Sequence, residues 1–221
     1  MVEEESEYGS GGRQQGIAAE ILGRHRKSTQ PESQQVCAVL GAVLEVVKGE
    51  GLEPTPTALF AALMSALEND ATRSTAEVAT AVGTILSTVL SRTPSSVVRA
   101  KYQASSALIA DVMDLHMDKA APLKAYLGCL AQLLAAADPS SWGPLTVRPW
   151  GMLLHLATDP RPKVRKRAAT GMVEVLAALQ RTPALNTASD ALQRACTKVF
   201  QAPEAAARAA AAASNKKRAE A

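Results

Sequence analysis

Five basic residues lie within seven positions of this chain, at Arg161, Lys163, Arg165, Lys166 and Arg167. Clustered cations can contact phosphates and release the counterions of a nucleic acid, so one interpretation is a ridge that contacts RNA or an acidic partner. The alternative is a solvated turn, in which Arg165 is tied to Asp159. Only seven aromatic residues occur, too few for a base-stacking platform, so contact with the backbone of RNA is favoured over sequence readout.

The residues around the cluster predict a turn between two helices. Asp159 can cap a helix start, and Pro162 suits a first helical turn because its missing N–H would be unpaired there. Val164 is expected to anchor the second helix on its neighbour, and Arg165 to flank that buried stripe and lean back toward a carboxylate in the turn. Asp159, Pro162, Val164 and Arg165 therefore form a predicted structural turn, of the kind that joins the antiparallel helices of a HEAT-type repeat.

A similar segment occurs earlier in the chain. Residues 90–99 (LSRTPSSVVR) match residues 156–165 (LATDPRPKVR) without gaps in their leucine, proline, valine and arginine. Equivalent positions of stacked repeats line up on one face. We therefore expect Arg92, Arg99 and Lys101 to extend the ridge of Arg161, Lys163, Lys166 and Arg167 along one rim.

The elements that must position these residues are helices. Hydrophobic residues make up 47% of the 221 residues but aromatic residues only 3%, which favours closely packed helices over sheets. Apolar residues at helical spacing predict helices from Pro31 to before Gly49, from Pro56 through Leu67, over 78–89, from Pro94 through Met113, over 123–134, up to Ala157, from Pro162, and over 188–200. The predicted fold is all-α, a HEAT/armadillo-like superhelical solenoid of antiparallel helix pairs.

Three parts are expected along the chain. Residues 1–30 form a disordered or weakly helical tail, because the glutamate-rich start and the glycine run after it have no periodic apolar face. Residues 31–202 form the helical repeats, and residues 203–221 an alanine-rich basic tail. Neither end resembles a dedicated cap, so a fragment of a longer solenoid is expected.

Several function classes find no support in the sequence. No apolar run approaches the roughly 20 residues that span a bilayer, so no membrane role is predicted. Three well-separated cysteines disfavour both disulfides and a metal knuckle, and indicate a reducing compartment. His25, His116 and His155 are far apart, and no phosphate-binding loop or nucleophile motif occurs, so we predict no enzyme and no cofactor.

Two further groups of residues have alternative interpretations. Asp111, Asp114 and Asp118 have helical spacing, but three like charges on one helix are typical of a solvated edge and too few to predict a metal site. Trp142 and Trp150 flank a proline-containing loop. An exposed tryptophan there would be an anchor for a partner, whereas a buried one would fill the gap between uneven repeats, which we favour.

Five segments occur in an order and at a spacing that match a known family: residues 36–40 (VCAVL) with 45–47 (EVV), 60–64 (FAALM), 90–95 (LSRTPS), Trp142 with Gly143, and 160–169 (PRPKVRKRAA). Over residues 33 to about 180, the chain resembles the N-terminal part of the large HEAT-repeat ribosomal RNA-processing proteins of pre-ribosomes.

The resemblance implies a non-catalytic scaffold of ribosome biogenesis in the nucleus and nucleolus. It also implies a role in subunit maturation and nuclear export, with contacts to ribosomal RNA in pre-ribosomal particles, to ribosome assembly factors, and to import receptors and a Ran-type GTPase. The alternative is a HEAT-repeat protein–protein adaptor, similar to a transport receptor or a phosphatase scaffold, with no nucleic-acid role.

Overall fold

The computed structural model describes the backbone of residues 16–219 and the side chains of residues 16–201. Within these residues the chain is helical and contains no strand, which confirms the predicted all-α fold. The elements are α1 (Ile17–His25), α2 (Pro31–Gly49), α3 (Pro56–Glu68), α4 (Asp70–Ser74), α5 (Ala76–Leu90), α6 (Ser95–Leu115), α7 (Ala120–Ala136), the 3-10 turn η1 (Pro139–Ser141), α8 (Val147–Leu156), α9 (Pro162–Ala178) and α10 (Ala184–Ala219).

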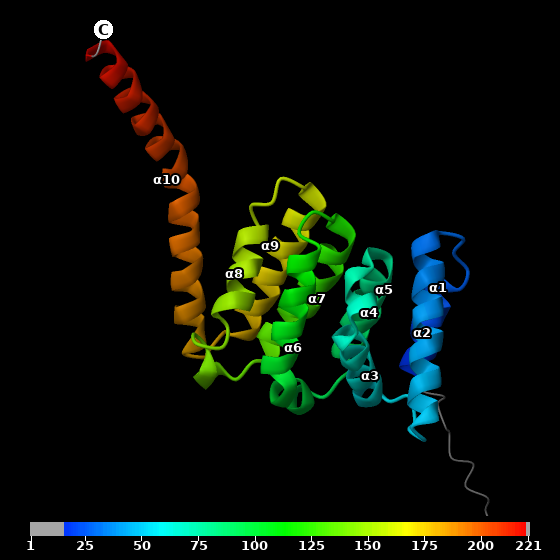
Figure 1. The fold of residues 1–221 in the computed structure, drawn as a ribbon. Coiled ribbons are helices and arrows are strands. Elements are labelled where there is room, and N and C mark those ends of the chain that lie inside the picture. Colours follow the sequence, from blue (N-terminus) through cyan, green and yellow to red (C-terminus); the bar gives the residue numbers. More distant parts are fainter. Residues whose placement is uncertain (1–15, 220–221) are drawn as a thin grey trace, which may run out of the picture.

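The helices form consecutive antiparallel pairs that stack into a solenoid (Figure 1). The pairs are α1–α2, α3–α5 with the short α4 between them, α6–α7 and α8–α9, and α10 packs beside the last pair. The second helices of the pairs, α2, α5, α7 and α9, stack directly on one another, and we call them the second-helix layer. The first helices α3, α6 and α8 form the other layer, which we call the first-helix layer.

The connections within pairs and between pairs lie at opposite ends of the helices. Turns from a first to a second helix lie along the upper rim in Figure 1, and turns from a second helix to the next pair lie along the lower rim. The four helices of the second-helix layer therefore run parallel, and their N-termini all begin at the upper rim.

Proline and side-chain caps set several helix starts, as the sequence predicts. Pro31, Pro56 and Pro162 each occupy the first turn of a helix, where the absent N–H has no helical partner to lose. Thr55 caps α3, because its hydroxyl accepts a hydrogen bond from the N–H of Ala58 (3.2 Å). Asn69 caps α4 in the same way, through the N–H of Ala71 (2.9 Å).

The packed part of the chain begins earlier than the predicted boundary at residue 31. Helix α1 packs on α2, and Ile17 and Ile21 are buried in the core. Helix α1 has only nine residues and two buried apolar side chains, so its sequence shows no clear helical periodicity. A helix this short depends on tertiary packing for its stability. The remainder of the predicted tail, residues 1–15, lies outside the described residues.

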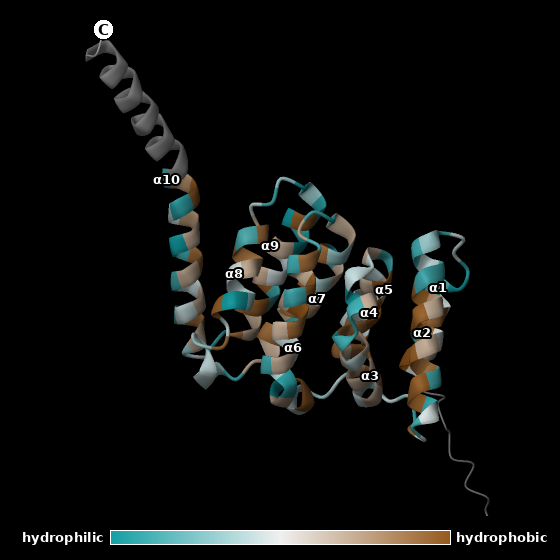
Figure 2. Ribbon diagram, in the orientation of Figure 1, coloured by the Kyte–Doolittle hydropathy of each residue, from teal (hydrophilic) through white to brown (hydrophobic). Residues whose placement is uncertain are grey.

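At the other end, the backbone of α10 continues as one helix through the predicted boundary at residue 203. Hydrophilic and hydrophobic turns alternate along its described part (Figure 2). Ala184 and Ala188 are buried against the preceding pair, whereas Phe200 is exposed. Contact with the solenoid is therefore concentrated at the N-terminal end of α10.

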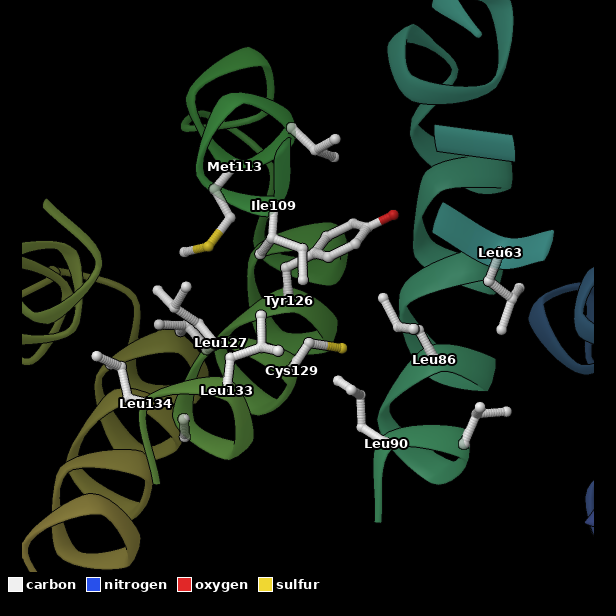
Figure 3. Packing of buried hydrophobic residues seen from close by; sticks show 14 of the residues in the cluster. Leu63, Leu86, Leu90, Ile109, Met113, Tyr126, Leu127, Cys129, Leu133 and Leu134 are labelled. Carbon is white, nitrogen blue, oxygen red and sulfur yellow. The ribbon is translucent and has the colours of Figure 1, made fainter. Parts of the chain in front are cut away.

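The core is centred on α7, which lies among α5, α6 and α9. Figure 3 shows Tyr126 and Cys129 of α7 directed toward α5, where Leu86 is fully buried. The stacking is close at two glycines. A Cβ added at Gly83 of α5 would lie 3.0 Å from the Cβ of Ala125, and one at Gly171 of α9 would lie 3.1 Å from that of Ala131. The absence of side chains at these positions lets α5 and α9 approach α7.

Candidate nucleic-acid interface

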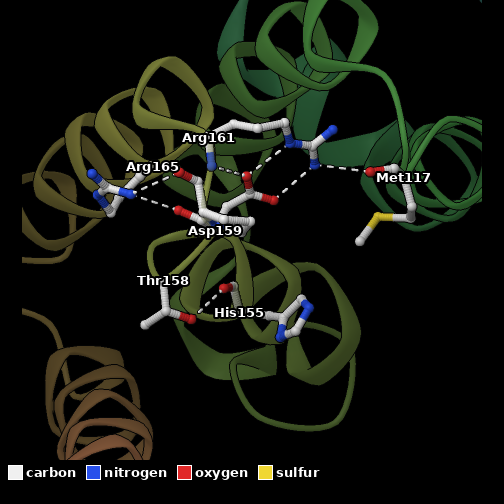
Figure 4. A network of polar contacts seen from close by, with 7 residues as sticks. Met117, His155, Thr158, Asp159, Arg161 and Arg165 are labelled. Atoms are coloured by element: carbon white, nitrogen blue, oxygen red, sulfur yellow. Dashed lines mark hydrogen bonds and ion pairs between the residues drawn. The ribbon is translucent and has the colours of Figure 1, made fainter.

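The turn between α8 and α9 is organised by the Asp159 carboxylate (Figure 4). Its Oδ1 accepts hydrogen bonds from the backbone N–H of Arg161 (2.8 Å) and from Nε of the same residue (2.8 Å), and its Oδ2 accepts from Nη2 (2.7 Å). Nη2 of Arg161 also donates to the carbonyl of Met117 (2.8 Å), which joins this turn to the loop after α6. Arg161 is therefore held within the fold.

This ion pair shifts both ionisation equilibria. The hydrogen bonds from Arg161 lower the pKa of Asp159 to about 2, and those same bonds raise the pKa of Arg161 above its ordinary value. The carboxyl group is buried, whereas the Arg161 side chain is 29% exposed. Both groups are therefore charged at neutral pH, and their pairing reduces the positive potential that Arg161 presents to a ligand.

The partner of Asp159 differs from the prediction. Arg165 was expected to pair with the carboxylate, but its Nη1 donates to the backbone carbonyls of Asp159 (2.7 Å) and Pro160 (3.4 Å). Arg161 takes the carboxylate because it directly precedes α9 and can fold back within the turn. Pro162 occupies the first turn of α9, and Val164 is fully buried.

The predicted continuous ridge does not form. Residues 90–99 connect a second helix, α5, to the first helix of the next pair, whereas residues 156–165 connect α8 to α9 within a pair. The two similar segments therefore lie on opposite rims (Figure 1). Arg92 pairs with Glu20 (3.3 Å), Nε of Arg99 donates to the carbonyl of Ala136 (3.2 Å), and Lys101 is exposed on α6.

A groove on the second-helix layer instead brings basic residues together. Its volume is about 680 Å³, and residues from α2, α5, α7 and α9 line it. We call it the basic groove and define it by Thr84, Ser87 and Thr88 of α5, Lys124 and Gly128 of α7, and Lys163 and Arg167 of α9. Glu32 of α2 lines its far side. Lys163 and Arg167 were predicted to bind RNA, and the structure places them in this groove.

Arg167 crosses the groove through a notch at Gly128. A Cβ added at Gly128 would lie 2.9 Å from Nη2 of Arg167 and 3.3 Å from Oγ of Ser87. The missing side chain therefore lets the guanidinium extend from α9 over α7 toward α5. Nη1 of Arg167 also pairs with Oε1 of Glu174 (3.0 Å), and the arginine side chain is 24% exposed. Arg167 is thus fixed in position and partly neutralised.

The two lysines of the groove are more available. Lys124 and Lys163 are exposed, and neither takes part in an ion pair found among residues 16–201. Lys166 is also exposed on α9 but does not line the groove. Sequence reasoning missed Lys124, which is a single charge within an apolar helix. The repeated Thr80, Thr84 and Thr88 on α5 could have indicated a polar helix face opposite the core.

An adjoining hollow has a different character. Its volume is about 610 Å³, and His25, the start of α2, α5 and the start of α7 line it. The apolar part of the lining comes from residues such as Val36, Ala81 and Pro122, and the charged part from Glu32, Glu77 and Lys119. We call it the N-terminal hollow. The second-helix layer is thus acidic and apolar at its α2 end and basic at its α9 end.

The remaining candidates have structural contacts. Nη2 of Arg148 pairs with Asp111 (2.6 Å) and Asp114 (2.8 Å), which joins α6 to α8. Asp118 is exposed beyond the end of α6. Within the described residues, no group of three or more His, Cys, Asp or Glu residues is arranged to hold a metal ion. Among those same residues, no helix has the length and apolar character to cross a membrane.

The two tryptophans pack against each other. Their rings are edge to face, with centroids 5.8 Å apart, and both side chains are buried. Nε1 of Trp150 donates to the carbonyl of Ala188 in α10 (3.2 Å). Trp142 and Trp150 therefore fill the space between α8 and α10, in agreement with a packing role.

Comparison with known proteins identifies the family. A family model described as RRP12-like, N-terminal HEAT repeats, matches residues 3–221. The chain belongs to the RRP12-like family. It is similar to the RRP12-like proteins of Homo sapiens and Gallus gallus, with 37% and 36% identity over 156 residues, and to Ribosomal RNA-processing protein 12 of Saccharomyces cerevisiae, with 29% identity over 168 residues.

Each of these matches covers 69% of this chain. The matched segment spans only 12% of the human and chicken RRP12-like proteins and 14% of the yeast protein. No solved structure matches the chain. The RRP12-like relationship therefore concerns the N-terminal HEAT repeats of much longer proteins.

Proposed function

We propose that this chain is a non-catalytic HEAT-repeat scaffold of ribosome biogenesis that contacts ribosomal RNA within pre-ribosomal particles. The observation that carries the proposal is the family match over residues 3–221, together with the name of the yeast relative, a ribosomal RNA-processing protein. The basic groove supports the RNA contact, because its lysines face solvent on one continuous surface of the solenoid.

Protein partners are part of the same proposal. The N-terminal hollow has an apolar wall with two carboxylates, Glu32 and Glu77, and one lysine, Lys119, a surface that suits a protein segment better than phosphates. Ribosome assembly factors are the partners that we expect there. Contacts with import receptors and a Ran-type GTPase, a role in nuclear export, and a nuclear and nucleolar location follow from the resemblance to pre-ribosome scaffolds and complete the proposal.

The hydrogen bonds of the histidines in the described residues favour a scaffold over an enzyme. The closest approach to a catalytic pair in the described residues is Nδ1 of His25, which lies 3.3 Å from Oγ of Ser33. That distance is long for an activated nucleophile, and no hydrogen bond orients the other ring nitrogen in the described part of the chain. His116 is instead engaged with the backbone carbonyl of Arg73 (2.7 Å).

The test is recovery of native particles. An affinity-tagged chain is expressed in cultured cells, purified at low salt, and the bound RNA and proteins are sequenced and identified. We expect enrichment of precursor ribosomal RNA and assembly factors over a tag-only control. Recovery of import receptors or phosphatase subunits without precursor RNA would instead support the adaptor alternative, and recovery equal to the control would refute both.

A further inference from the structure

We propose that the basic groove is a binding site for the sugar–phosphate backbone of RNA, with Lys124 and Lys163 as the cations that contact phosphates. This inference deepens the proposed function and rests on its RNA contact. It assigns that contact to a groove across α7 and α9, to which the basic segment 161–167 contributes Lys163 and Arg167 but not Arg161 and Arg165, which are held by the fold.

The two lysines reach the groove from neighbouring parallel helices. Lys124 lies in the second turn of α7, and Lys163 in the first turn of α9. Both helices begin at the same rim, so the positive ends of their dipoles add to the charge of the lysines. Neither helix start is capped by a side chain at Lys119 or Arg161, the residues that precede α7 and α9.

The other walls leave the lysines as the principal donors. The hydroxyls of Thr84 and Thr88 on α5 donate to carbonyls of their own helix, at 2.8 and 3.5 Å. Ser87 Oγ accepts a hydrogen bond from Gln132 (3.1 Å), and the guanidinium of Arg167 lies beside it. These groups and Ala120, Ala121 and Ala125 complete the lining, so Lys124 and Lys163 are the groups best placed to pair with phosphates.

The charge distribution limits the ligand to one end of the layer. Three cations line the basic groove with one carboxylate, Glu32, whereas the N-terminal hollow has two carboxylates, Glu32 and Glu77, and one lysine, Lys119, on an apolar wall. Phosphates are therefore attracted toward α9 and repelled from the α2 end. No aromatic side chain lines the basic groove, so bases have no stacking surface there and binding is independent of sequence.

The experiment compares two variants with equal loss of charge. Lys124→Gln/Lys163→Gln removes the two groove cations, and Arg194→Gln/Lys198→Gln removes two exposed cations from α10 as the matched control. Binding to a fluorescent oligouridylate and to an RNA duplex is measured by anisotropy from about 0.05 to 0.3 M salt. Circular dichroism checks that both variants keep their helices.

Each single-strand phosphate contact contributes about 0.7 to the slope of log K against log salt, and each duplex contact about 0.9. The groove variant should therefore lose about 1.4 from the slope with oligouridylate, or about 1.8 with the duplex. The RNA for which the slope falls by this amount is the form that the groove binds. Near 0.1 M salt a slope change of about 1.4 corresponds to roughly 25-fold weaker binding. The control variant should remain close to the parent chain.

The outcomes separate this inference from the proposed function. If the parent chain binds neither RNA, the proposed RNA contact fails and the groove assignment fails with it. If the parent chain binds RNA but both variants lose affinity equally, only the groove assignment is refuted. If polyglutamate displaces RNA at equal charge concentration, the groove is instead a site for acidic protein segments.

Discussion

Replacing Asp159 by asparagine tests whether the ion pair with Arg161 stabilises the stacked turns. The substitution keeps the shape of the side chain and removes its charge. Because Nη2 of Arg161 also bonds the carbonyl of Met117, the loss weakens the connection between the α6–α7 and α8–α9 turns as well as the turn itself. We expect Asp159→Asn to destabilise the fold at neutral pH.

The magnitude follows from the lowered pKa. A folded-state pKa of about 2 against about 3.9 in the unfolded chain corresponds to about 2.6 kcal/mol of stability. The Arg161 side chain is 29% exposed, so solvent screening reduces the expected loss to about 1–2 kcal/mol. Because the folded-state pKa is depressed, this stabilisation is fully present above about pH 5 and is lost as the pH falls toward 2.

The assay is urea unfolding followed by circular dichroism, at pH 7 and at several values down to about pH 2.5. Asp190→Asn, at an exposed position of α10, is the control and should change the free energy of unfolding by less than about 0.5 kcal/mol. The difference between the parent chain and Asp159→Asn should shrink below pH 4. A difference at pH 7 no larger than that of the control, or one that does not change with pH, would refute the reasoning.

Three further predictions concern packing and burial. Leu127→Ala should cost about 2–5 kcal/mol in urea unfolding, because this fully buried side chain leaves a cavity beneath α9; a cost below about 1 kcal/mol would contradict the packing. Gly171→Ala should be less stable than Gly151→Ala by about 1–2 kcal/mol, since both substitutions gain helix propensity but only the Cβ at Gly171 would lie 3.1 Å from a neighbouring Cβ. Equal free energies of unfolding for the two variants would contradict the close approach. Burial raises the pKa of Cys129 to about 12, so iodoacetamide at pH 8 should alkylate exposed Cys196 and leave Cys129 unmodified until urea unfolds the chain. The modified cysteines are identified by mass spectrometry. Alkylation of Cys129 in the folded chain would contradict its burial in the core.

The helical architecture could be predicted from local signals. Prolines at helix starts and apolar residues at helical spacing place α2, α3 and α9 close to their observed bounds. Residues 1–30 were predicted to be a disordered or weakly helical tail, and the packing of α1 in the core was not predicted because its short apolar pattern has meaning only when Ile17 and Ile21 lie against α2. Local periodicity therefore finds long helices and misses those that depend on their neighbours.

The candidate site was harder to predict because it is made by stacking. Residues 90–99 and 156–165 share proline, valine and arginine, but sequence similarity does not reveal that one turn lies within a pair and the other between pairs. The sequence also does not determine which arginine pairs with the Asp159 carboxylate, since Arg161 and Arg165 are both within reach of the turn. Lys124 and Gly128 join Arg167 only when α7 lies between α5 and α9.

Crosslinking on purified pre-ribosomal particles that contain the chain tests the central claim most directly. Ultraviolet irradiation joins RNA to the residues that touch it, and mass spectrometry of the digested particles identifies the crosslinked peptides. We predict crosslinks on the second-helix layer, in the peptides of α7 and α9 that contain Lys124 and Lys163. RNA crosslinks confined to α3, α6 and α8 of the first-helix layer would contradict the account.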